Sequence, residues 1–295
     1  MSIPEAFNEF FADLGLTSSQ GAAPVVAVLR LSGAIGAVSM ARRGLTLAAL
    51  EPIIKRAFAR RARAVCLVIN SPGGSAVQSS QIAGLIRQYS QEKKIPVFAF
   101  VEDVAASGGY WLSLAADQIY ADPMSVVGSI GVISASFGFH DLIERIGIER
   151  RVHAQGTHKS MLDPFKPEDE EDVRRLGEIQ ADIHKEFKSF VRARRGSRLR
   201  ADDDVLFNGD VWTGNRALDL GLIDGLGDVR SVMRDKYGPN VRFQVLDRGP
   251  GFLQRLFGRL VPGQALGSFG GDSGGWVSDA LAAVEERALW ARFGL

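Results

Sequence analysis

The chain has 295 residues, of which 46% are hydrophobic and 23% are charged, so it is long enough to fold around one large core with appendages. Its net charge of +1 implies no strongly charged partner. The single cysteine, Cys66, excludes an intrachain disulfide framework and is typical of a reducing compartment.

The sequence contains no stretch near the ~20 continuous apolar residues that a bilayer-spanning helix needs. Residues 1–7 also lack the basic region and the long apolar core of a signal peptide. Arginines gather between residues 192 and 200, but aspartates at 202, 203 and 204 follow at once. This pattern indicates a solvated helix end favoured by the helix dipole rather than a nucleic-acid surface. We therefore expect a cytoplasmic protein with no nucleic-acid partner.

From residue 24 to about residue 246, short β-branched runs alternate with segments of helical period. This alternation is typical of βαβ units around a mostly parallel sheet, so the expected fold class is α/β. Strands are expected over residues 25–29, 64–69, 97–101, 125–132 and 149–152. Helices are expected over residues 47–58, 82–91 and 142–146 and, with an apolar stripe that faces the core, from about residue 167. Terminal helical extensions are expected over residues 1–23 and 247–295, the second with a glycine-rich linker at 263–275.

Ser107 lies among small residues in the run Ala105-Ala106-Ser107-Gly108-Gly109, at the expected turn from a strand into a helix. Lys159 lies further on, in a loop led by Gly156. A serine hydroxyl is a poor nucleophile until a neighbouring base takes its proton, and a neutral lysine amine is a competent base. The pair therefore predicts a serine/lysine hydrolase that transfers the acyl group of a peptide bond.

Two glycine-rich turns are expected to meet at the carboxyl edge of the sheet. Pro72-Gly73-Gly74 follows the strand over 64–69, and Ser107-Gly108-Gly109 follows the next strand. Ligand crevices of open α/β sheets lie outside the carboxyl ends of the strands. Glycine lets backbone N–H groups approach a substrate closely, so the two turns predict an oxyanion hole. Taken alone, Pro72-Gly73-Gly74 would be interpreted as an ordinary proline-glycine turn. A functional role is favoured only because a second glycine-rich turn follows the next strand.

Together these segments resemble the signal peptide peptidase A (SppA) and SohB family of serine peptidases, relatives of the Clp protease proteolytic subunit and of the crotonase fold. The resemblance covers roughly residues 24–245. Its motifs are Asn70-Ser71-Pro72-Gly73-Gly74, Ala106-Ser107-Gly108-Gly109-Tyr110, Gly128-Ser129-Ile130-Gly131 and Lys159-Ser160 before Asp163-Pro164-Phe165. It implies a peptidase domain over residues 24–246 with a crotonase/ClpP-like core of repeated ββα or βαβ units.

The resemblance assigns roles to the matching residues. Ser107 is the expected nucleophile and Lys159 the expected general base. Ser129 is expected to orient the lysine amine. The amides of Gly73 or Gly74 and of Gly108 are expected to bind the oxyanion. The implied reaction is endopeptidase cleavage of hydrophobic or unstructured peptides, such as signal-peptide remnants, through an acyl-enzyme. We predict no cofactor and no metal. Ring-like homo-oligomers are also implied, in which neighbouring subunits complete each other's sites.

A lysine base imposes a condition on its surroundings. A free lysine side chain has a pKa near 10.4, so only about one molecule in a thousand is a neutral amine at neutral pH. Burial against apolar surface disfavours the ammonium form and makes the amine available. Met161, Leu162 and Phe165 are expected to supply that surface around Lys159, while Asp163 must point elsewhere.

Other catalytic patterns are weaker. His158 is a competing base in the lysine loop and is interpreted as a solvent-facing residue. A histidine triad of the Clp type needs a histidine on the helix shortly after the nucleophile, and the sequence has none between Ser107 and His140. Residues 271–275 copy the Gly-Asp-Ser-Gly-Gly signature of chymotrypsin-like proteases, but that fold needs two β-barrels and upstream histidine and aspartate partners. They are therefore interpreted as part of the linker.

The chain ends and the reaction class leave alternatives open. Apolar residues gather near residues 7–14 and 252–260, and such segments either lie at a membrane surface or pack on a neighbouring subunit. Peripheral membrane contact therefore stays open, beside peptide substrates and further copies of the chain as partners. A crotonase-like acyl-CoA enzyme and a catalytically silent assembly protein are the alternatives to a peptidase, and neither requires Ser107 and Lys159 as a pair.

Overall fold

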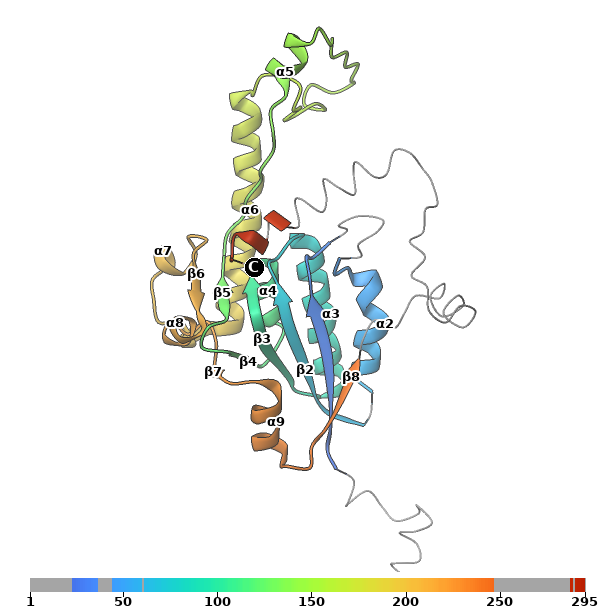
Figure 1. The fold of residues 1–295 in the computed structure, drawn as a ribbon, viewed down its shortest axis with the longest axis vertical. Coiled ribbons are helices and arrows are strands. Elements are labelled where there is room, and N and C mark those ends of the chain that lie inside the picture. Colours follow the sequence, from blue (N-terminus) through green and yellow to red (C-terminus); the bar gives the residue numbers. More distant parts are fainter. Residues whose placement is uncertain (1–22, 37–43, 60, 247–286, 289, 295) are drawn as a thin grey trace, which may run out of the picture.

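The computed structural model describes residues 23–36, 44–59, 61–246, 287–288 and 290–294. Within these residues the chain builds an eight-stranded, mostly parallel sheet with helices on both faces (Figure 1). The expected α/β fold is therefore confirmed. The strands are β1 (Val25–Ser32), β2 (Ala62–Ser71), β3 (Val97–Ala106), β4 (Gln118–Ala121), β5 (Val126–Gly128), β6 (Val211–Thr213), β7 (Gly225–Leu226) and β8 (Arg242–Leu246).

Strand β3 is central to the sheet, whose strand order is β6-β5-β3-β2-β1-β8. The first half of β3 pairs with β4, which in turn pairs with β7, while its last three residues pair with β5. All these pairs are parallel, and β5 pairs with β6 in the antiparallel sense. The carboxyl end of β3 is thus flanked by β2 and β5, and Ser107 follows it directly.

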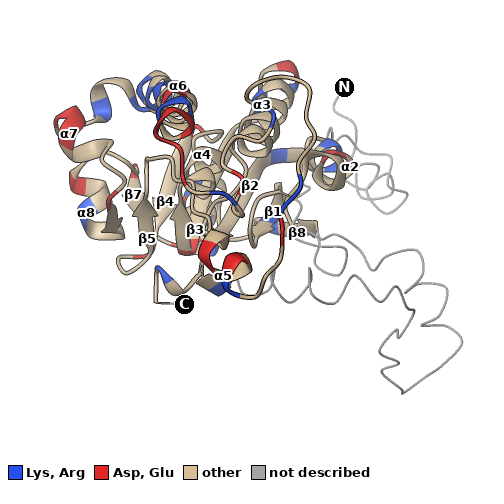
Figure 2. Ribbon diagram, turned by 90° about the horizontal axis from the view of Figure 1, so that it is seen from above, with Lys and Arg blue, Asp and Glu red and all other residues tan. Residues whose placement is uncertain are grey.

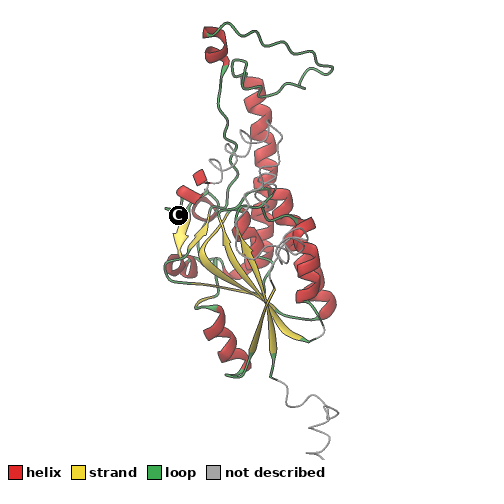
Figure 3. Cartoon of the chain, turned by 45° about the vertical axis from the view of Figure 1, so that its right-hand side comes forward, coloured by secondary structure: helices red, strands yellow, loops and turns green. Residues whose placement is uncertain are grey.

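The described helices are α2 (Leu47–Ala57), α3 (Ala76–Lys93), α4 (Gly108–Ser113), α5 (His140–Arg145), α6 (Glu170–Arg195), α7 (Asp203–Leu206), α8 (Gly214–Asp219) and α9 (Val229–Tyr237), with a 3₁₀ turn at Gly196–Arg198. Helices α2, α3, α4 and the second half of α6 cover one face of the sheet (Figure 3), and buried Leu29 and Leu31 of β1 belong to the same core as residues of these helices. On the other face, Met233 of α9 packs with Val26 and Phe100. Alternate residues of β1 thus enter two cores, because successive side chains of a strand point to opposite faces.

Capping residues explain where the helices next to the site begin. The hydroxyl of Ser75 accepts a hydrogen bond from the Gln78 N–H at 3.3 Å, so α3 starts directly after the first glycine turn. The carboxylate of Asp169 accepts from the Glu171 N–H at 2.9 Å and begins α6. The predicted helices over 82–91 and from about residue 167 are therefore present, the first of them longer than expected.

Residues 134–179, here named the arm, project beyond the carboxyl edge of the sheet (Figures 1 and 3). The arm consists of an irregular segment, α5, a loop and the first part of α6. Many of its large apolar side chains are exposed, from 37% for Phe139 to 78% for Phe137. The others are Leu142, Ile146, Ile148, Val152, Val173 and Ile179. Rings of Phe137 and Phe165 contact that of Phe139, but Phe137, Phe139 and the others given above remain exposed within the described structure, so the arm presents an apolar surface.

Three sequence predictions in this region are wrong. The strand expected over 149–152 is an irregular loop, and the strand expected over 125–132 is reduced to Val126–Gly128. Backbone groups form a strand only where a neighbour pairs with them, and β6 meets only these three residues. The apolar stripe of α6 also faces the core only in its second half, since Phe187 is 3% exposed but Ile179 is 49% exposed. The first half of the helix lies on the arm, beyond the elements that bury Phe187.

The expected terminal extensions fall mostly on residues 1–22 and 247–286, which lie outside the described residues, as do the glycine-rich linker and its Gly-Asp-Ser-Gly-Gly run. Residues 287–288 and 290–291 are helical. No described helix combines the length and the apolarity that crossing a bilayer requires. Cys66 is buried in β2, and burial raises the pKa of its thiol, so its expected core role is confirmed.

The arginines at the end of α6 are paired. Arg192 contacts Asp203 of α7, and Arg195 contacts Asp224 at 2.7 Å with a side chain that is only 2% exposed. Figure 2 shows the acidic start of α7 and the basic residues that end α6. The interpretation as a helix end is therefore right, but this end is partly buried and ion-paired rather than solvated.

Asp224→Asn is expected to lower the free energy of unfolding by roughly 3 kcal/mol near neutral pH, since it leaves buried Arg195 without this charged partner. Burial raises the pKa of the Asp224 carboxyl, but hydrogen bonds from Arg195 outweigh burial and hold it below its usual value. A lowered folded-state pKa means that the stabilisation is present above the unfolded pKa, near 3.9, and is lost as the pH falls through the folded value. In urea unfolding, the free energies of unfolding of the unmodified protein and of Asp224→Asn should therefore differ at neutral pH and become equal in strong acid. An equal difference at both pH values would contradict this.

Candidate active site

Ser107 occupies a strained turn between β3 and α4. Its backbone angles, φ 51° and ψ −118°, lie in a region that residues other than glycine rarely adopt. Two backbone hydrogen bonds hold the turn, from the Ser107 N–H to the Gly128 carbonyl at 2.8 Å and from the Trp111 N–H to the Ser107 carbonyl at 2.9 Å. The Ser107 hydroxyl does not cap α4 and has no hydrogen-bond partner among the described residues. The turn therefore presents a free hydroxyl to the cavity that Ser107 lines.

The first glycine turn packs against the serine turn, as the sequence predicts. A Cβ at Gly73 would lie 2.8 Å from the Ser107 Cβ, and a Cβ at Gly74 would lie 2.1 Å from the Ile35 carbonyl oxygen. Both glycines also have positive φ, 107° and 142°. Only glycine fits such positions, so these contacts bring the loops of two neighbouring strands together at the carboxyl edge.

Two amides at this junction are free to bind an oxyanion. The Gly73 N–H donates to the Ser71 hydroxyl at 3.3 Å. In the described part of the chain no hydrogen bond occupies the N–H groups of Gly74 and Gly108. The Gly74 nitrogen lies 3.5 Å from the position that a Cβ of Gly108 would take. Of the alternatives that the sequence leaves open, the geometry therefore favours Gly74 with Gly108.

Gly74→Ala is expected to lower the free energy of unfolding by about 2 kcal/mol or more, because its Cβ would collide with the Ile35 carbonyl oxygen. Hydrolysis of casein should fall with it, since the same shift displaces the Gly74 amide. Gly84→Ala in α3 is the matched control: nothing lies within 4 Å of its Cβ position, and alanine should raise stability by up to about 1 kcal/mol. Equal thermal unfolding of the two variants would disprove this account of the turn.

Ser129 follows β5 and lines the same cavity as Ser107. Its φ is 53°, and two hydrogen bonds fix its turn, from the Ser129 N–H to the Asp210 carbonyl at 2.6 Å and from the Gly131 N–H to the Ser129 carbonyl at 2.9 Å. Among the described residues its hydroxyl has no partner either. The cavity thus holds two serine hydroxyls that the fold itself does not use.

His184 of α6 is a neighbour of the site that sequence reasoning missed. One of its ring nitrogens lies 3.2 Å from the carbonyl oxygen of Ile130, in the turn that follows β5. No local signal marks this histidine, because its contact depends on where α6 crosses that turn. No histidine of the described residues lines the cavity, so the geometry gives no support to a histidine triad.

The cavity around Ser107 has a volume of about 620 Å³ and combines polar backbone with an apolar wall. Trp111, Ile183 and Phe187 contribute to the wall, and the Trp111 ring lies 4.8 Å from that of Phe187 and 5.0 Å from that of Phe190. Pockets of this kind bind apolar side chains and use a few polar groups for orientation. Phe187 therefore serves the core, as predicted, and the cavity as well.

Lys159 is not among the residues that line this cavity. It is exposed in the loop between α5 and α6, which lies on the arm at the top of Figure 1, and its N–H donates to the Gly156 carbonyl at 3.2 Å. Asp163 does point elsewhere: the Phe165 N–H and Arg150 donate to its carboxylate and hold its pKa below the usual value. Within one copy of the chain, the serine and glycine residues of the expected site thus lie together at the cavity, whereas Lys159 lies outside it.

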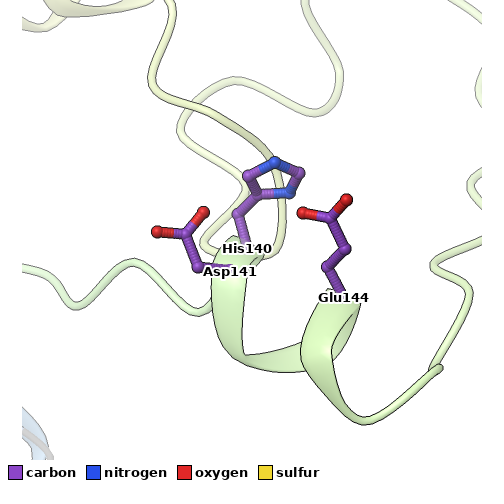
Figure 4. A group of neighbouring side chains, drawn as sticks. All are labelled: His140, Asp141 and Glu144. Carbon is purple, nitrogen blue, oxygen red and sulfur yellow. The ribbon is translucent and has the colours of Figure 1, made fainter.

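The arm also carries a group of possible metal ligands. Ligand atoms of His140, Asp141 and Glu144 lie within 4.8 Å of one another on α5 (Figure 4). All three belong to one six-residue helix, and Arg150 and Lys166 line the adjoining cavity with His140 and Glu144. These positive charges oppose a bound cation, so we assign the group no metal, and the expectation of a metal-free enzyme stays a prediction.

The α/β fold and the strained serine turn are typical of serine hydrolases. Comparison with known proteins shows which family of hydrolases this chain resembles. Peptidase family S49 matches residues 89–237, half of the 295-residue chain. The chloroplastic serine protease SPPA of Arabidopsis thaliana is 30% identical over 238 residues, which cover 77% of this chain and 34% of that protein. A putative protease of Synechocystis is 31% identical over 192 residues, covering 65% of this chain and 67% of that protein. The chain belongs to peptidase family S49, and the predicted resemblance to SppA and SohB peptidases is confirmed.

A protein of Brucella abortus named Na(+)/H(+) antiporter NhaA is 48% identical over 282 residues, which cover 92% of this chain and 37% of that protein. The chain therefore spans little more than a third of this relative and of the Arabidopsis protease. Among solved structures, a lysine-to-alanine variant of the 1510-N membrane-bound stomatin-specific protease in complex with a substrate peptide superposes with a TM-score of 0.51. The match covers 81% of this chain and 98% of that chain at 19% identity, and it supports the fold.

Proposed function

We propose that this protein is a serine endopeptidase in which Ser107 is the nucleophile and Lys159 of a neighbouring copy is the general base. The observation that carries the proposal is the strained Ser107 turn. Among the described residues its hydroxyl has no hydrogen-bond partner, and it lies beside the amides of Gly74 and Gly108, which have none there either. Acyl transfer needs such an arrangement, with a nucleophile within reach of a carbonyl carbon whose oxygen meets N–H donors. Ser129 is proposed to orient the lysine amine.

In the proposed reaction the Ser107 hydroxyl attacks the scissile carbonyl carbon while the neutral lysine amine takes its proton. The carbonyl oxygen becomes an oxyanion held by the amides of Gly74 and Gly108, each such donor being worth roughly 10²- to 10³-fold in rate. The C–N bond then breaks, the lysine ammonium protonates the leaving amine, and an ester remains on Ser107. Water, deprotonated by the same amine, hydrolyses the ester and restores the serine.

The general base, Lys159, is assigned to a neighbouring copy because its loop lies on the arm and does not line the cavity of the same chain. The arm exposes apolar side chains such as Phe137 and Ile146, a surface that a second copy would cover. Contact between the arm of one copy and the carboxyl edge of the next would bring Lys159 to Ser107 and bury its amine. Met161, already half-buried, would add to that desolvation. Repetition of one such head-to-tail contact would form a ring if the rotation between neighbouring copies closes.

We infer that the substrates are hydrophobic or unstructured peptides, such as remnants of signal peptides. The apolar wall formed by Trp111, Ile183 and Phe187 favours apolar side chains, and a cavity of about 620 Å³ admits a peptide segment but no folded domain. A relative from Enterococcus faecium, 32% identical over 167 residues, is named putative signal peptide peptidase SppA. That name supports the same substrate class for this chain.

A fluorophosphonate probe tests the assignment, since it labels only serines that a base activates. The probe should modify Ser107 in the full chain, as located by peptide mass spectrometry, and the labelled protein should no longer cleave casein. Lys159→Ala should abolish labelling. Modification of another serine would place the nucleophile elsewhere. Turnover of acyl-CoA thioesters without peptide cleavage would instead support the crotonase-like alternative. A folded protein with neither activity would support the assembly role.

A further inference from the structure

We propose that Ser79 is a positioning residue of the oxyanion hole, whose hydroxyl holds the amides of Gly74 and Gly108 in the arrangement that binds the oxyanion. Ser79 belongs to α3, is 0% exposed and lines the same cavity as Ser107. Its effect on hydrolysis acts through the two amides and not through contact with the reacting atoms. The inference rests on the proposed function and adds to it a residue that is neither nucleophile, base nor oxyanion donor.

Ser79 places a hydroxyl on the apolar face of α3. Ile82, Ala83 and Ile86 follow it at helical spacing and are fully buried on the same face of the helix. An apolar residue at position 79 would continue this face, and burying a hydroxyl costs free energy unless the hydroxyl is hydrogen-bonded. The presence of a serine here therefore needs a reason other than packing.

Helix α3 gains little from this hydroxyl. The Ser79 hydroxyl donates to the Ser75 carbonyl at 2.8 Å. The same carbonyl already accepts the backbone N–H of Ser79 at 3.0 Å, which is the normal helical hydrogen bond. Serine side chains that bond back in this way slightly destabilise a helix. The main consequence of the bond is that it fixes the rotamer of Ser79, and with it the place of the oxygen.

The fixed oxygen lies directly against Gly108. A Cβ at Gly108 would be 2.4 Å from the Oγ of Ser79, 3.0 Å from the Cδ1 of Ile35 and 3.5 Å from the nitrogen of Gly74. The φ of Gly108 is not positive, so its backbone conformation is open to other residues. The space that the Ser79 oxygen occupies, and not the backbone conformation, therefore requires glycine at position 108.

Ser79 is also tied to the other oxyanion amide. The carbonyl that accepts its hydroxyl belongs to Ser75, the residue after Gly74, and the Ser75 N–H donates to the Ile35 carbonyl at 2.8 Å. Ser79 thus lies against Gly108 directly and holds Gly74 through the next residue. Oxyanion donors are effective only when they are preorganised around the developing charge, and small displacements are costly in rate. A side chain that joins the two turns therefore contributes to catalysis.

Steady-state hydrolysis of a fluorogenic apolar peptide by the full chain tests the proposal. Ser79→Ala should lower kcat about tenfold, less than the roughly 10²-fold or greater loss expected when a donor is removed outright. KM should stay nearly unchanged, because the oxyanion forms only in the transition state. A purely structural role would not produce this division between kcat and KM.

The matched control is Ser90→Ala near the other end of α3. It removes a buried hydroxyl that donates to the Ile95 carbonyl at 2.9 Å and does not line the cavity. Both variants should lose similar, small amounts of thermal stability, but Ser90→Ala should keep its kcat. An unchanged kcat in Ser79→Ala, or equal losses of kcat in both variants, would overturn the proposal.

A double-variant cycle tests the contact with Gly108. Gly108→Ala should lower the unfolding temperature and the rate of hydrolysis, because its Cβ meets the Ser79 oxygen. Ser79→Ala removes that oxygen, so adding it to Gly108→Ala should recover part of the lost unfolding temperature. Gly109→Ala is the control, since its Cβ would lie 2.5 Å from the Ser71 carbonyl oxygen, which Ser79→Ala leaves in place. Recovery in neither pair, or equally in both, would contradict the contact.

Labelling by the fluorophosphonate probe separates this inference from the proposed function. Absence of label on Ser107 in the unmodified chain would refute the assignment of the nucleophile, and the role of Ser79 with it. Labelled Ser107 together with an unchanged kcat in Ser79→Ala would refute the role of Ser79 alone.

Discussion

Ser107→Ala is expected to reduce peptide hydrolysis by roughly 10⁴- to 10⁶-fold, the loss seen when serine peptidases lose their nucleophile. The Ser107 hydroxyl would form the acyl bond, and no other group that lines the cavity stands in the same strained turn. The fold should tolerate the change, because the hydroxyl has no hydrogen-bond partner within the described structure. Cleavage of casein and of a fluorogenic apolar peptide, with thermal unfolding in parallel, gives the measurement.

Ser80→Ala is a matched control on the exposed side of α3 and should retain full activity. Activity of Ser107→Ala above about a tenth of that of the unmodified protein would place the nucleophile elsewhere, since the remaining oxyanion donors alone supply far less. A loss of activity accompanied by a large fall in unfolding temperature would show that the serine supports the fold instead.

The meeting of the two glycine turns could be predicted from sequence because its signals are local. Each turn directly follows a strand of β-branched residues, and parallel strands bring their carboxyl ends to one edge. The structure also distinguishes the two glycines of the first turn, which the sequence does not. The Gly73 amide already has a partner in Ser71, whereas the Gly74 amide has none among the described residues. Two adjacent glycines look alike in a sequence, and only their hydrogen bonds separate them.

Contacts between distant segments could not be predicted in the same way. The Ser129 turn depends on a hydrogen bond to the carbonyl of Asp210, and the carbonyl of Ile130, which follows Ser129, contacts His184 of α6. The expected strand over 149–152 shows the converse error: the segment Glu149-Arg150-Arg151-Val152 holds one β-branched residue, and no described strand pairs with it. These features depend on tertiary pairing, and under the proposed shared site the location of Lys159 relative to the cavity would depend on quaternary structure as well.

Mixing two inactive variants, Ser107→Ala and Lys159→Ala, is expected to restore about a quarter of the original activity when equal amounts are dissociated and reassembled together. A shared site takes its serine from one copy and its lysine from the next. It is complete only where a Lys159→Ala chain, which keeps the serine, meets a Ser107→Ala chain, which keeps the lysine. With random assembly this is one of four equally frequent neighbour pairs. Hydrolysis of the fluorogenic peptide by the mixture measures the recovery.

The same mixture distinguishes a shared site from one closed within a single chain by movement of the arm. Folding the arm back would place both residues in one copy, and no mixture of the two variants could then recover activity. The double variant Ser107→Ala/Lys159→Ala, mixed with either single variant, is the control and should stay inactive under both arrangements. A shared site should also lose activity on dilution, because dissociation separates Ser107 from Lys159 of the neighbouring copy. Recovery that persists in isolated monomers would therefore contradict a base supplied by the neighbouring copy.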